Sequence, residues 1–419
     1  MKARYQYRIY PTDQQQQSLA QLFGCVRVVW NDALATCKQA EKLPRYDQLS
    51  AMLTQTKKTE AREWLNLVSA VPLQQSLRQL RIAYKNFFDS LNGKRKGKKL
   101  NSPKFKKKSN QQSATFTDNA FKFSDGIVYL AKIGNLKPIW SRELLSIPSS
   151  VTVIKDAANR YFLSFVVEVE PVQINAKNQS IGIDLGIKTF AVMSDGSKAK
   201  SPDYLEFDRK IRHLQKKLAR QQKGSNRRNK TRIQIAKRHN QIADTRKDFL
   251  HKLSTRVVND NQVISLEDLN VSGMVKNRRL ARVISLQGWR EFRTLCEAKS
   301  EKLAREFHVI NRWEPTSQVC SDCGFKWGKI DLSIRSVLCL SCGTEQDRDE
   351  NAAKNINKSR HRALGDSKRM WSDSKTTLVA SCCEASRITV DFGVSSVERF
   401  SPVSMSSSRI LEVLFGSSI

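Results

Sequence analysis

Hydrophobic and polar residues change their spacing along the chain, and each change predicts a different kind of element. Residues 4–10 alternate in the manner of a β-strand, and Pro11 ends the run. Thr12 suits the N-cap of a helix, because apolar residues then recur at helical spacing as far as Trp30. A second helical pattern covers about residues 73–91. This N-terminal part is therefore expected to be mostly helical.

Between residues 115 and 170 the pattern turns to short alternating runs. Residues 121–130 predict a hairpin with an Asp-Gly turn. Residues 151–154 and 161–169 predict a further pair of strands around Asn159. We expect a small β domain here, to which the strand at residues 4–10 adds an edge.

The next part of the chain mixes short strands with long helices. Residues 181–184 and 263–266 are apolar runs typical of buried strands. Residues 203–258 between them predict a helical hairpin that turns at residues 224–226. Its segment 209–240 contains thirteen Lys and Arg and no Asp or Glu, so the outer face of the hairpin is expected to be very basic.

Beyond residue 363 the chain is rich in serine and has no periodicity, so residues 364–419 are expected to form a poorly ordered tail. Residues 411–415, Leu-Glu-Val-Leu-Phe, resemble part of a protease-cleavage linker and are set aside as a tag remnant.

The charge balance points to an anionic partner. The chain has 73 Lys and Arg against 40 Asp and Glu, a net charge of +33, and nucleic acid is the usual polyanion that covers such a surface. Residues 94–108 contain nine basic residues and no acidic one. The alternatives are a solvated loop there, and a ribosomal-type or merely basic protein overall. Candidate contacts in the basic segments are Lys104, Lys106, Lys107, Arg227 and Arg228.

The chain has no sign of a membrane or export segment. No apolar run approaches the ~20 residues that span a bilayer, and the N-terminus lacks the apolar core of a signal peptide. We therefore expect an intracellular, cytoplasmic protein that does not act at a membrane. In such a reducing compartment, the nine cysteines favour metal binding by some of them over a disulfide framework.

Four cysteines have the spacing of a zinc ribbon. Cys320-x2-Cys323 and Cys339-x2-Cys342 are separated by fifteen residues, and a glycine follows the second cysteine of each pair. Four thiolates leave no open position for water, so the predicted zinc is structural. Two disulfides or an iron–sulfur cluster are the alternatives. Cys25 and Cys296 are expected to pack as small apolar residues.

Three carboxylates stand out by their positions. Asp184 and Glu267 each follow a predicted strand, and Asp349 lies where a helix begins just after the ribbon. Such an arrangement suits a ribonuclease-H-type fold, in which neighbouring strands and a late helix converge. A carboxylate cluster is costly when it is ionised and unpaired, and divalent cations remove that cost. Hard oxygen ligands favour magnesium, with two ions about 4 Å apart at a phosphodiester.

Several segments, in order, resemble the TnpB family of transposon-encoded, RNA-guided nucleases, ancestral to the type V CRISPR effectors. They are YRIYP (7–11), YKNFF (84–88), SPKFKKK (102–108), IGIDLGIKTFAV (181–192), RKDFLHKLS (246–254), ISLEDLNVSGM (264–274), TSQVCSDCG (316–324) and DRDENAAKNI (347–356). The match covers roughly residues 1–360. The resemblance implies a RuvC nuclease domain with Asp184, Glu267 and Asp349 as magnesium ligands. The alignment of Asp-x-Asn-Ala-Ala alone prefers Asp349 over Asp347, which suits a helix cap.

The resemblance also implies a multidomain α/β and β fold, with a helical recognition domain, a small β-barrel-like wedge domain, and a ribonuclease-H-like RuvC domain that contains the inserted four-cysteine zinc ribbon. The boundaries are 1–15 and 115–175 for the wedge, 16–114 for recognition, 176–312 and 346–363 for RuvC, and 313–345 for the ribbon. The implied partners are a guide RNA and a double-stranded DNA target, bound by a monomer rather than a dimer, at the nucleoid of a bacterial or archaeal cell.

Base pairing with the guide would read the target, while the protein checks a short motif beside it. Tyr46, Gln74 and Thr117 are candidates for that check. Arg246 and His251 are candidates for nucleic-acid contact near the cut, or for a structural role in helix packing. Trp289 is expected in the core rather than in catalysis.

Other functions are weighed against the nuclease. Some TnpB relatives have lost acidic residues and act as guided DNA-binding repressors, but all three carboxylates are present in this chain. A strand-transferring transposase is disfavoured because the five histidines form no His-x-His pair, although a link to a transposable element, as an accessory factor, stays open. A ribosomal or RNA-scaffold protein explains the charge and the ribbon but not the carboxylates.

Overall fold

The structure is a computed structural model that describes residues 1–95, 99–331 and 333–359. The predicted tail at residues 364–419, with its linker-like end, lies outside the described residues. The bounds of the helices and strands are β1 (Lys2–Ile9), α1 (Asp13–Gln39), α2 (Tyr46–Thr56), η1 (Glu60–Leu67), α3 (Ala70–Leu91), β2 (Gln112–Thr117), η2 (Asp118–Ala120), β3 (Phe121–Ser124), β4 (Ile127–Leu130), β5 (Gly134–Leu136), β6 (Pro138–Ile139), β7 (Ser150–Lys155), β8 (Tyr161–Glu168), β9 (Asn178–Leu185), β10 (Ala191–Met193), β11 (Lys198–Ala199), α4 (Leu205–Ala219), α5 (Asn226–Asp260), β12 (Asn261–Glu267), α6 (Val271–Met274), α7 (Ala281–Gln287), α8 (Trp289–Lys302), β13 (Glu306–Ile310), β14 (Ser336–Leu338), β15 (Glu345–Asp347) and α9 (Arg348–Lys358).

The N-terminal helices begin where the sequence predicts. Thr12 caps α1 with a capping box: its hydroxyl accepts from the Gln15 backbone at 3.3 Å, while the Gln15 side chain accepts from the Thr12 backbone at 3.0 Å. Helices α1 and α3 pack on each other through buried faces that contain Cys25, which is 1% exposed as expected. The described part of the chain contains no helix long and apolar enough to cross a membrane.

A five-stranded antiparallel sheet forms the β part, in the order β2-β7-β8-β1-β6. The predicted pairing of residues 151–154 with 161–169 is confirmed as β7 and β8, and Asn159 adopts φ 62° in the turn between them. The prediction that the strand at residues 4–10 joins this sheet is confirmed, because β1 pairs with β8. Its place at the edge is wrong, because β6 pairs with the far side of β1. That pairing lasts only two residues, and Pro138, which has no N–H to donate, suits the true edge.

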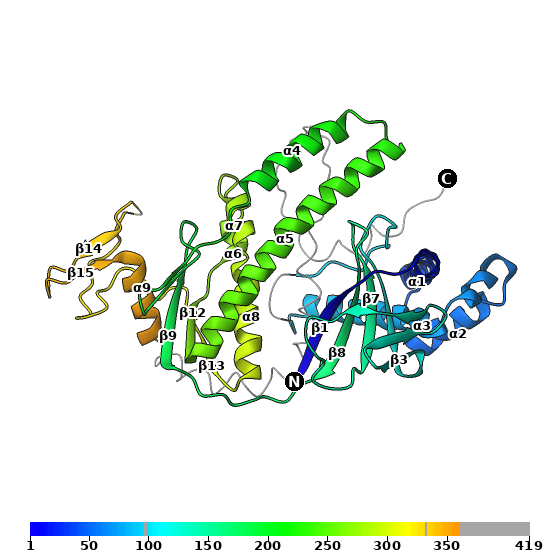
Figure 1. The fold of residues 1–419 in the computed structure, drawn as a ribbon, viewed down its shortest axis with the longest axis horizontal. Helices are drawn as coiled ribbons and strands as arrows, with labels where there is room; N and C mark the ends of the chain where they lie inside the picture. The colour runs from blue at the N-terminus through cyan, green and yellow to red at the C-terminus, as the bar shows by residue number, and fades with distance from the viewer. Residues whose placement is uncertain (96–98, 332, 360–419) are drawn as a thin grey trace. The chain divides into compact units, whose positions relative to one another are not determined.

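A second five-stranded sheet, in the order β11-β10-β9-β12-β13, lies further along the chain. Strands β9, β12 and β13 are parallel, whereas β10 and β11 turn back antiparallel. Helix α9 packs against β9, β10 and β12 on one side, and α5 and α8 lie against the sheet on the other (Figure 1). The carboxyl ends of the three parallel strands therefore share one edge of this sheet.

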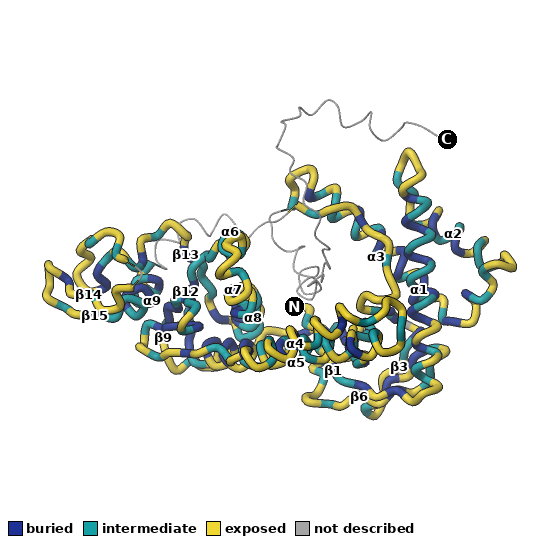
Figure 2. The backbone as a smooth tube through the Cα atoms, turned by 90° about the horizontal axis from the view of Figure 1, so that it is seen from above, coloured by how far each residue is buried: buried dark blue, intermediate teal, exposed yellow. Residues whose placement is uncertain are grey.

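The basic helical hairpin is confirmed as α4 and α5. Ser225 caps α5, and Gly224 takes the left-handed φ of 87° that the turn requires. Its core is thin, since Ile211 and Leu218 are the buried residues of α4. Figure 2 shows much of the remaining surface of the two helices as exposed. The hairpin is thus held by few apolar contacts and presents mostly charge.

Candidate active site and zinc ribbon

The four predicted zinc ligands are gathered at one point. Their sulfur atoms all lie within 4.8 Å of one another, with Cys320 Sγ 3.8 Å from Cys342 Sγ and Cys323 Sγ 3.5 Å from Cys339 Sγ. Tetrahedral zinc with bonds of about 2.3 Å requires sulfurs about 3.8 Å apart, whereas a disulfide requires about 2 Å. The alternative of two disulfides is therefore wrong, and the four thiols could hold a metal such as zinc.

Each cysteine pair forms the same tight knuckle. The Gly324 backbone donates to the Cys320 carbonyl at 3.0 Å, and the Gly343 backbone donates to the Cys339 carbonyl at 2.8 Å. Both glycines have a left-handed φ, 79° and 73°, which explains why glycine follows each pair.

Helix α9 is hydrogen-bonded to the ribbon through buried polar side chains. Asn351, 1% exposed, donates to the Val319 carbonyl at 2.8 Å and accepts from the Ser321 backbone at 2.7 Å. Gln346, just before α9, donates to the Cys320 sulfur at 3.3 Å and accepts from the Ser321 hydroxyl at 2.7 Å. These buried hydrogen bonds connect the ribbon to the start of α9.

Asp184 and Glu267 lie on neighbouring parallel strands in register. The pairing of β9 with β12 runs as far as Ile183 opposite Leu266, so Asp184 and Glu267 are the next residues along the two strands. Parallel strands in register point equivalent side chains to the same face, about 4.8 Å apart. The two carboxylates are therefore neighbours on the face that α9 covers.

Gly182 explains how α9 comes so close. A Cβ at this position would lie 2.2 Å from the Ala353 carbonyl oxygen and 2.5 Å from the Asn357 nitrogen, so only glycine leaves room for the helix backbone. Asp349 lies one helical turn before Ala353, and Asp184 lies two residues after Gly182 on the same face. The contact at Gly182 thus brings the third carboxylate toward the other two.

The electrostatics of Asp184 reflect this proximity. Burial, followed by the charges of Glu267 and Asp349, raises the pKa of Asp184 to about 7. Burial and the neighbouring Asp268 also raise the pKa of Glu267. Among the described residues, the four cysteines are the only group of three or more ligand side chains that lies close enough together to hold one ion.

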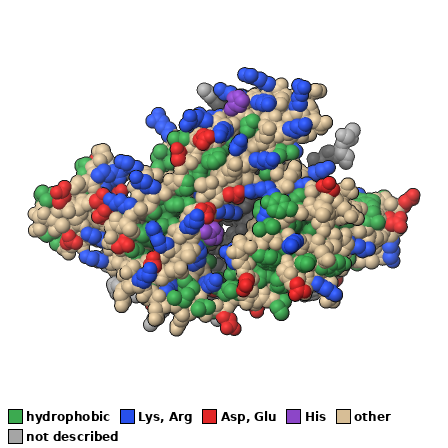
Figure 3. All heavy atoms as spheres, viewed as in Figure 1, with side chains coloured by type: hydrophobic (Ala, Val, Ile, Leu, Met, Phe, Trp, Pro, Cys, Tyr) green, Lys and Arg blue, Asp and Glu red, His purple; other side chains and the backbone are tan. Residues whose placement is uncertain are grey.

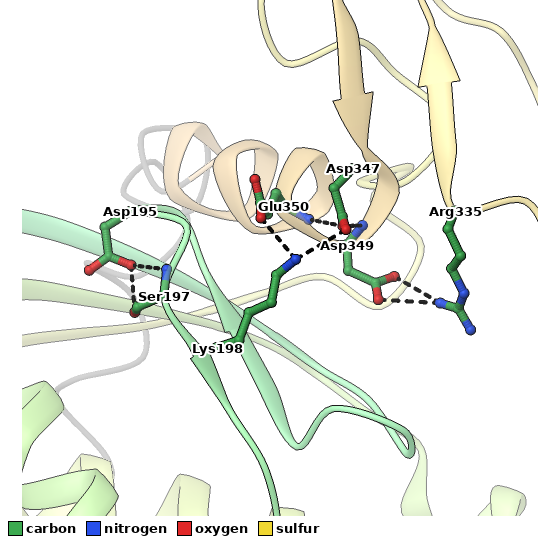
Figure 4. Close-up of polar contacts among 7 residues, drawn as sticks. All are labelled: Asp195, Ser197, Lys198, Arg335, Asp347, Asp349 and Glu350. Atoms are coloured by element: carbon green, nitrogen blue, oxygen red, sulfur yellow. Dashed lines mark hydrogen bonds and ion pairs between the residues drawn. The ribbon is translucent and has the colours of Figure 1, made fainter.

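Asp347 and Asp349 have different surroundings (Figure 4). Asp347 caps α9 by accepting from the Asp349 and Glu350 backbones at 2.9 and 3.1 Å, and it is ion-paired with Lys198 at 3.1 Å. Asp349 is ion-paired with Arg335 of the ribbon at 3.3 Å. Of the two, Asp349 is the aspartate whose charge acts on Asp184.

The candidate nucleic-acid residues fall into two groups. The side chains of Gln74, Lys104, Lys107 and Arg227 are exposed, and so is His251, whose backbone carbonyl accepts from Lys299.

The other candidates already have partners in the protein. Tyr46 lies under the Arg78 guanidinium, the Thr117 hydroxyl is 3.2 Å from Gln75 Nε2, and the Lys106 ammonium is 4.0 Å from the centre of the Trp30 ring.

Two candidate arginines of α5 also have partners. Arg246 is 3.8 Å from Glu291, and Arg228 donates to the Leu218 and Gln221 carbonyls at the end of α4. The structure therefore gives Arg228 a capping role. Trp289 is 3% exposed, in the core as expected, and Cys296 is fully buried.

Sequence reasoning missed the residues that organise the site. Lys198, Arg335 and Gln346 lie in exposed or short segments that carry no periodic signal. Gly182 could have been found from the sequence, because a glycine inside an apolar strand indicates a close approach of another backbone.

The chain is similar to several known proteins. Residues 164–278 match the family model described as "Probable transposase" (OrfB_IS605), and residues 289–356 match "Cas12f1-like, TNB domain". Residues 1–42 match a model described as "Helix-turn-helix domain", although in this structure they contain strand β1 and helix α1.

A Streptomyces pristinaespiralis protein that carries the provisional name of RNA-guided DNA endonuclease is 41% identical over 365 residues, covering 85% of this chain and 89% of that protein. InsQ of Escherichia coli K12, named in the same way, is 29% identical and covers 86% of this chain and 92% of its own length. The protein of a Cas12f1–sgRNA–target DNA complex has a similar fold, with a TM-score of 0.50 at 13% identity over 85% of this chain and 98% of its own. The resemblance found in the sequence is therefore confirmed, and the chain belongs to the TnpB family.

Proposed function

We propose that this chain is an RNA-guided DNA endonuclease of a transposable element, which cuts DNA at the site formed by Asp184, Glu267 and Asp349. The observation that carries the proposal is the register of β9 and β12, which sets Asp184 beside Glu267 on the face covered by α9. The names of the relatives, which describe RNA-guided DNA endonucleases, support the substrate and the guide.

The three carboxylates would hold magnesium, and their hard oxygen donors fit that role, as do the raised pKa values of Asp184 and Glu267. Magnesium at such a site supplies an activated water and stabilises the leaving oxygen of a phosphodiester. Asp184 must lose its proton to take part, because burial and its neighbours hold its pKa at about 7. Asp349 is the proposed third ligand, supported by its effect on Asp184, and Asp347 is assigned to capping.

The four cysteines are proposed to bind structural zinc, which would stabilise the fold of the ribbon. Through Asn351 and Gln346, the ribbon would also fix the start of α9 and therefore Asp349. In this proposal zinc supports the nuclease site without taking part in its chemistry.

The remaining parts are proposed to bind nucleic acid. We assign residues 16–114 to recognition, 1–15 and 115–175 to the wedge, 176–312 with 346–363 to RuvC, and 313–345 to the ribbon. Figure 3 shows Lys and Arg side chains gathered along the α4/α5 hairpin, which supports contact with phosphates. Guide pairing would read the target sequence, and the protein would check a short adjacent motif as a monomer.

The test uses the full chain with the RNA that copurifies with it, a matching duplex and Mg²⁺. We expect the wild type to cut the duplex and Asp184→Asn to bind the duplex without cutting it. A wild type that binds the duplex but does not cut it would instead make this chain a guided DNA-binding repressor.

A further inference from the structure

Trp313 is unusual among the tryptophans that the structure describes. It is 84% exposed, the largest fraction of any aromatic side chain that the structure describes. The other described tryptophans are buried or half-buried: Trp30, Trp64, Trp140, Trp289 and Trp327. A single exposed apolar side chain is ordinary, so the meaning of this one depends on its support and its surroundings.

The exposure of Trp313 does not come from a loose segment. The Trp313 backbone donates to the Asn311 side chain at 3.1 Å, and the Glu314 backbone donates to the Asn311 carbonyl at 3.0 Å. An asparagine that bonds the backbone two residues on makes a tight, defined turn. The indole is therefore presented to solvent on a fixed support.

This turn lies beside the carboxylate edge of the sheet. Ile310, the last residue of β13, pairs with Glu267, and Trp313 follows within about 10 Å of chain. Arg312 is ion-paired with Asp268, the residue after Glu267, and Arg293 binds the same carboxylate at 2.7 Å. Arg293 and Arg312 share the single Asp268 carboxylate, so two guanidinium groups lie near this turn, and guanidinium groups are strong phosphate ligands.

We propose that Trp313 is a stacking platform for a base of the single DNA strand that enters the carboxylate site, and that Arg293 and Arg312 attract the phosphates of that strand. The proposal rests on the nuclease function proposed above. Aromatic stacking accepts every base, which suits an enzyme whose target sequence is read by its guide. Paired bases inside a duplex cannot stack on an indole, so the strand must be single. One indole is also far smaller than the roughly 800 Å² that each partner contributes to a stable protein interface.

A binding experiment separates this proposal from the nuclease function. The full chain with its guide RNA and the Asp184→Asn substitution is titrated with a single-stranded DNA that contains 2-aminopurine, whose fluorescence falls on stacking. We expect quenching, and we expect Trp313→Ala to remove it and to weaken binding about 5- to 150-fold. Trp313→Phe should restore most of both, because it keeps an aromatic face. Leu340→Ala, an 86% exposed residue of the same ribbon, is the matched control and should change neither.

The outcomes are distinguishable. If Trp313→Ala quenches and binds like the parent, or if Trp313→Phe is as defective as Trp313→Ala, the stacking platform is refuted. Stronger quenching with RNA than with DNA of the same sequence would also overturn it, because the site would then belong to the guide. A wild type that never cuts contradicts the nuclease proposal alone, since the quenching measurement does not depend on cleavage.

Discussion

A single methyl group at Gly182 tests the contact on which the carboxylate site depends. In the Gly182→Ala variant, the new Cβ would lie 2.2 Å from the Ala353 carbonyl oxygen, whereas carbon and oxygen in contact need at least about 3 Å. Two of the three nearest atoms belong to the backbone of α9 and the third is the Cβ of Asn357, which is fixed to that backbone, so no side-chain rotation relieves the clash. Helix α9 must move away from β9 by close to 1 Å, and Asp349 must move with it.

The magnitude follows from that displacement. Overpacking of this kind costs about 1–3 kcal/mol, which lowers the melting temperature by roughly 1–3 °C in a chain of this size. A reacting group misplaced by about 1 Å can lose about 100-fold in rate. We therefore expect a folded protein that still binds guide RNA and target duplex but cuts about 100-fold more slowly.

The assay measures single-turnover cutting of a matching duplex, together with thermal melting. Gly24→Ala in α1 is the matched control, because its Cβ would meet no atom within 4 Å. That control should gain up to about 1 kcal/mol in stability and keep its cutting rate. If Gly182→Ala melts and cuts like the wild type, α9 is not held against β9 as described, and the assignment of Asp349 loses its support.

Three further predictions address the ribbon, the charge of the site and the basic hairpin. Asn351→Ala leaves the Ser321 backbone N–H without its buried partner, while the Val319 carbonyl keeps its bond from Asn355, so the substitution should cost about 1–3 kcal/mol and speed the loss of zinc to a chelator, measured by a zinc-sensitive dye. Because the pKa of Asp184 is raised to about 7, the free energy of unfolding falls as pH rises from about 4 to 7, by up to about 4 kcal/mol. Without Mg²⁺, the Asp184→Asn variant should therefore melt at a higher temperature than the wild type at pH 8 and at the same temperature at pH 4. Arg227→Ala should weaken RNA binding, seen as a shallower salt dependence, with unchanged melting, whereas Arg228→Ala should lower the melting temperature; equal melting of the two variants would contradict the capping role.

The sequence predicted those features that depend on neighbours along the chain. The N-cap at Thr12, the Asp-Gly hairpin at residues 125–126, the turn before Ser225 and the cysteine knuckles all depend on residues within a few positions of one another. Periodicity also located the strands that precede Asp184 and Glu267, because buried strands leave apolar runs.

Features that depend on distant residues were not predictable in this way. The two-residue strand at Pro138 displaces β1 from the edge, and no periodic pattern marks so short an element. The different surroundings of Asp347 and Asp349 depend on their ion-pair partners. Lys198, the partner of Asp347, is distant in sequence, and Arg335, the partner of Asp349, lies in the ribbon. The capping role of Arg228 likewise depends on carbonyl groups at the end of another helix.

The central claim is that Asp349, with Asp184 and Glu267, forms the site that cuts DNA. Its most direct test compares Asp349→Asn with Asp347→Asn in guided cleavage of a matching duplex with Mg²⁺. Asparagine caps helices as well as aspartate does, so Asp347→Asn should keep α9 in place and keep most of the activity. Asp349→Asn should bind the target and leave it intact. If Asp349→Asn cuts at the wild-type rate while Asp347→Asn does not cut, the third carboxylate of the site is Asp347, and the assignment of Asp349 is wrong.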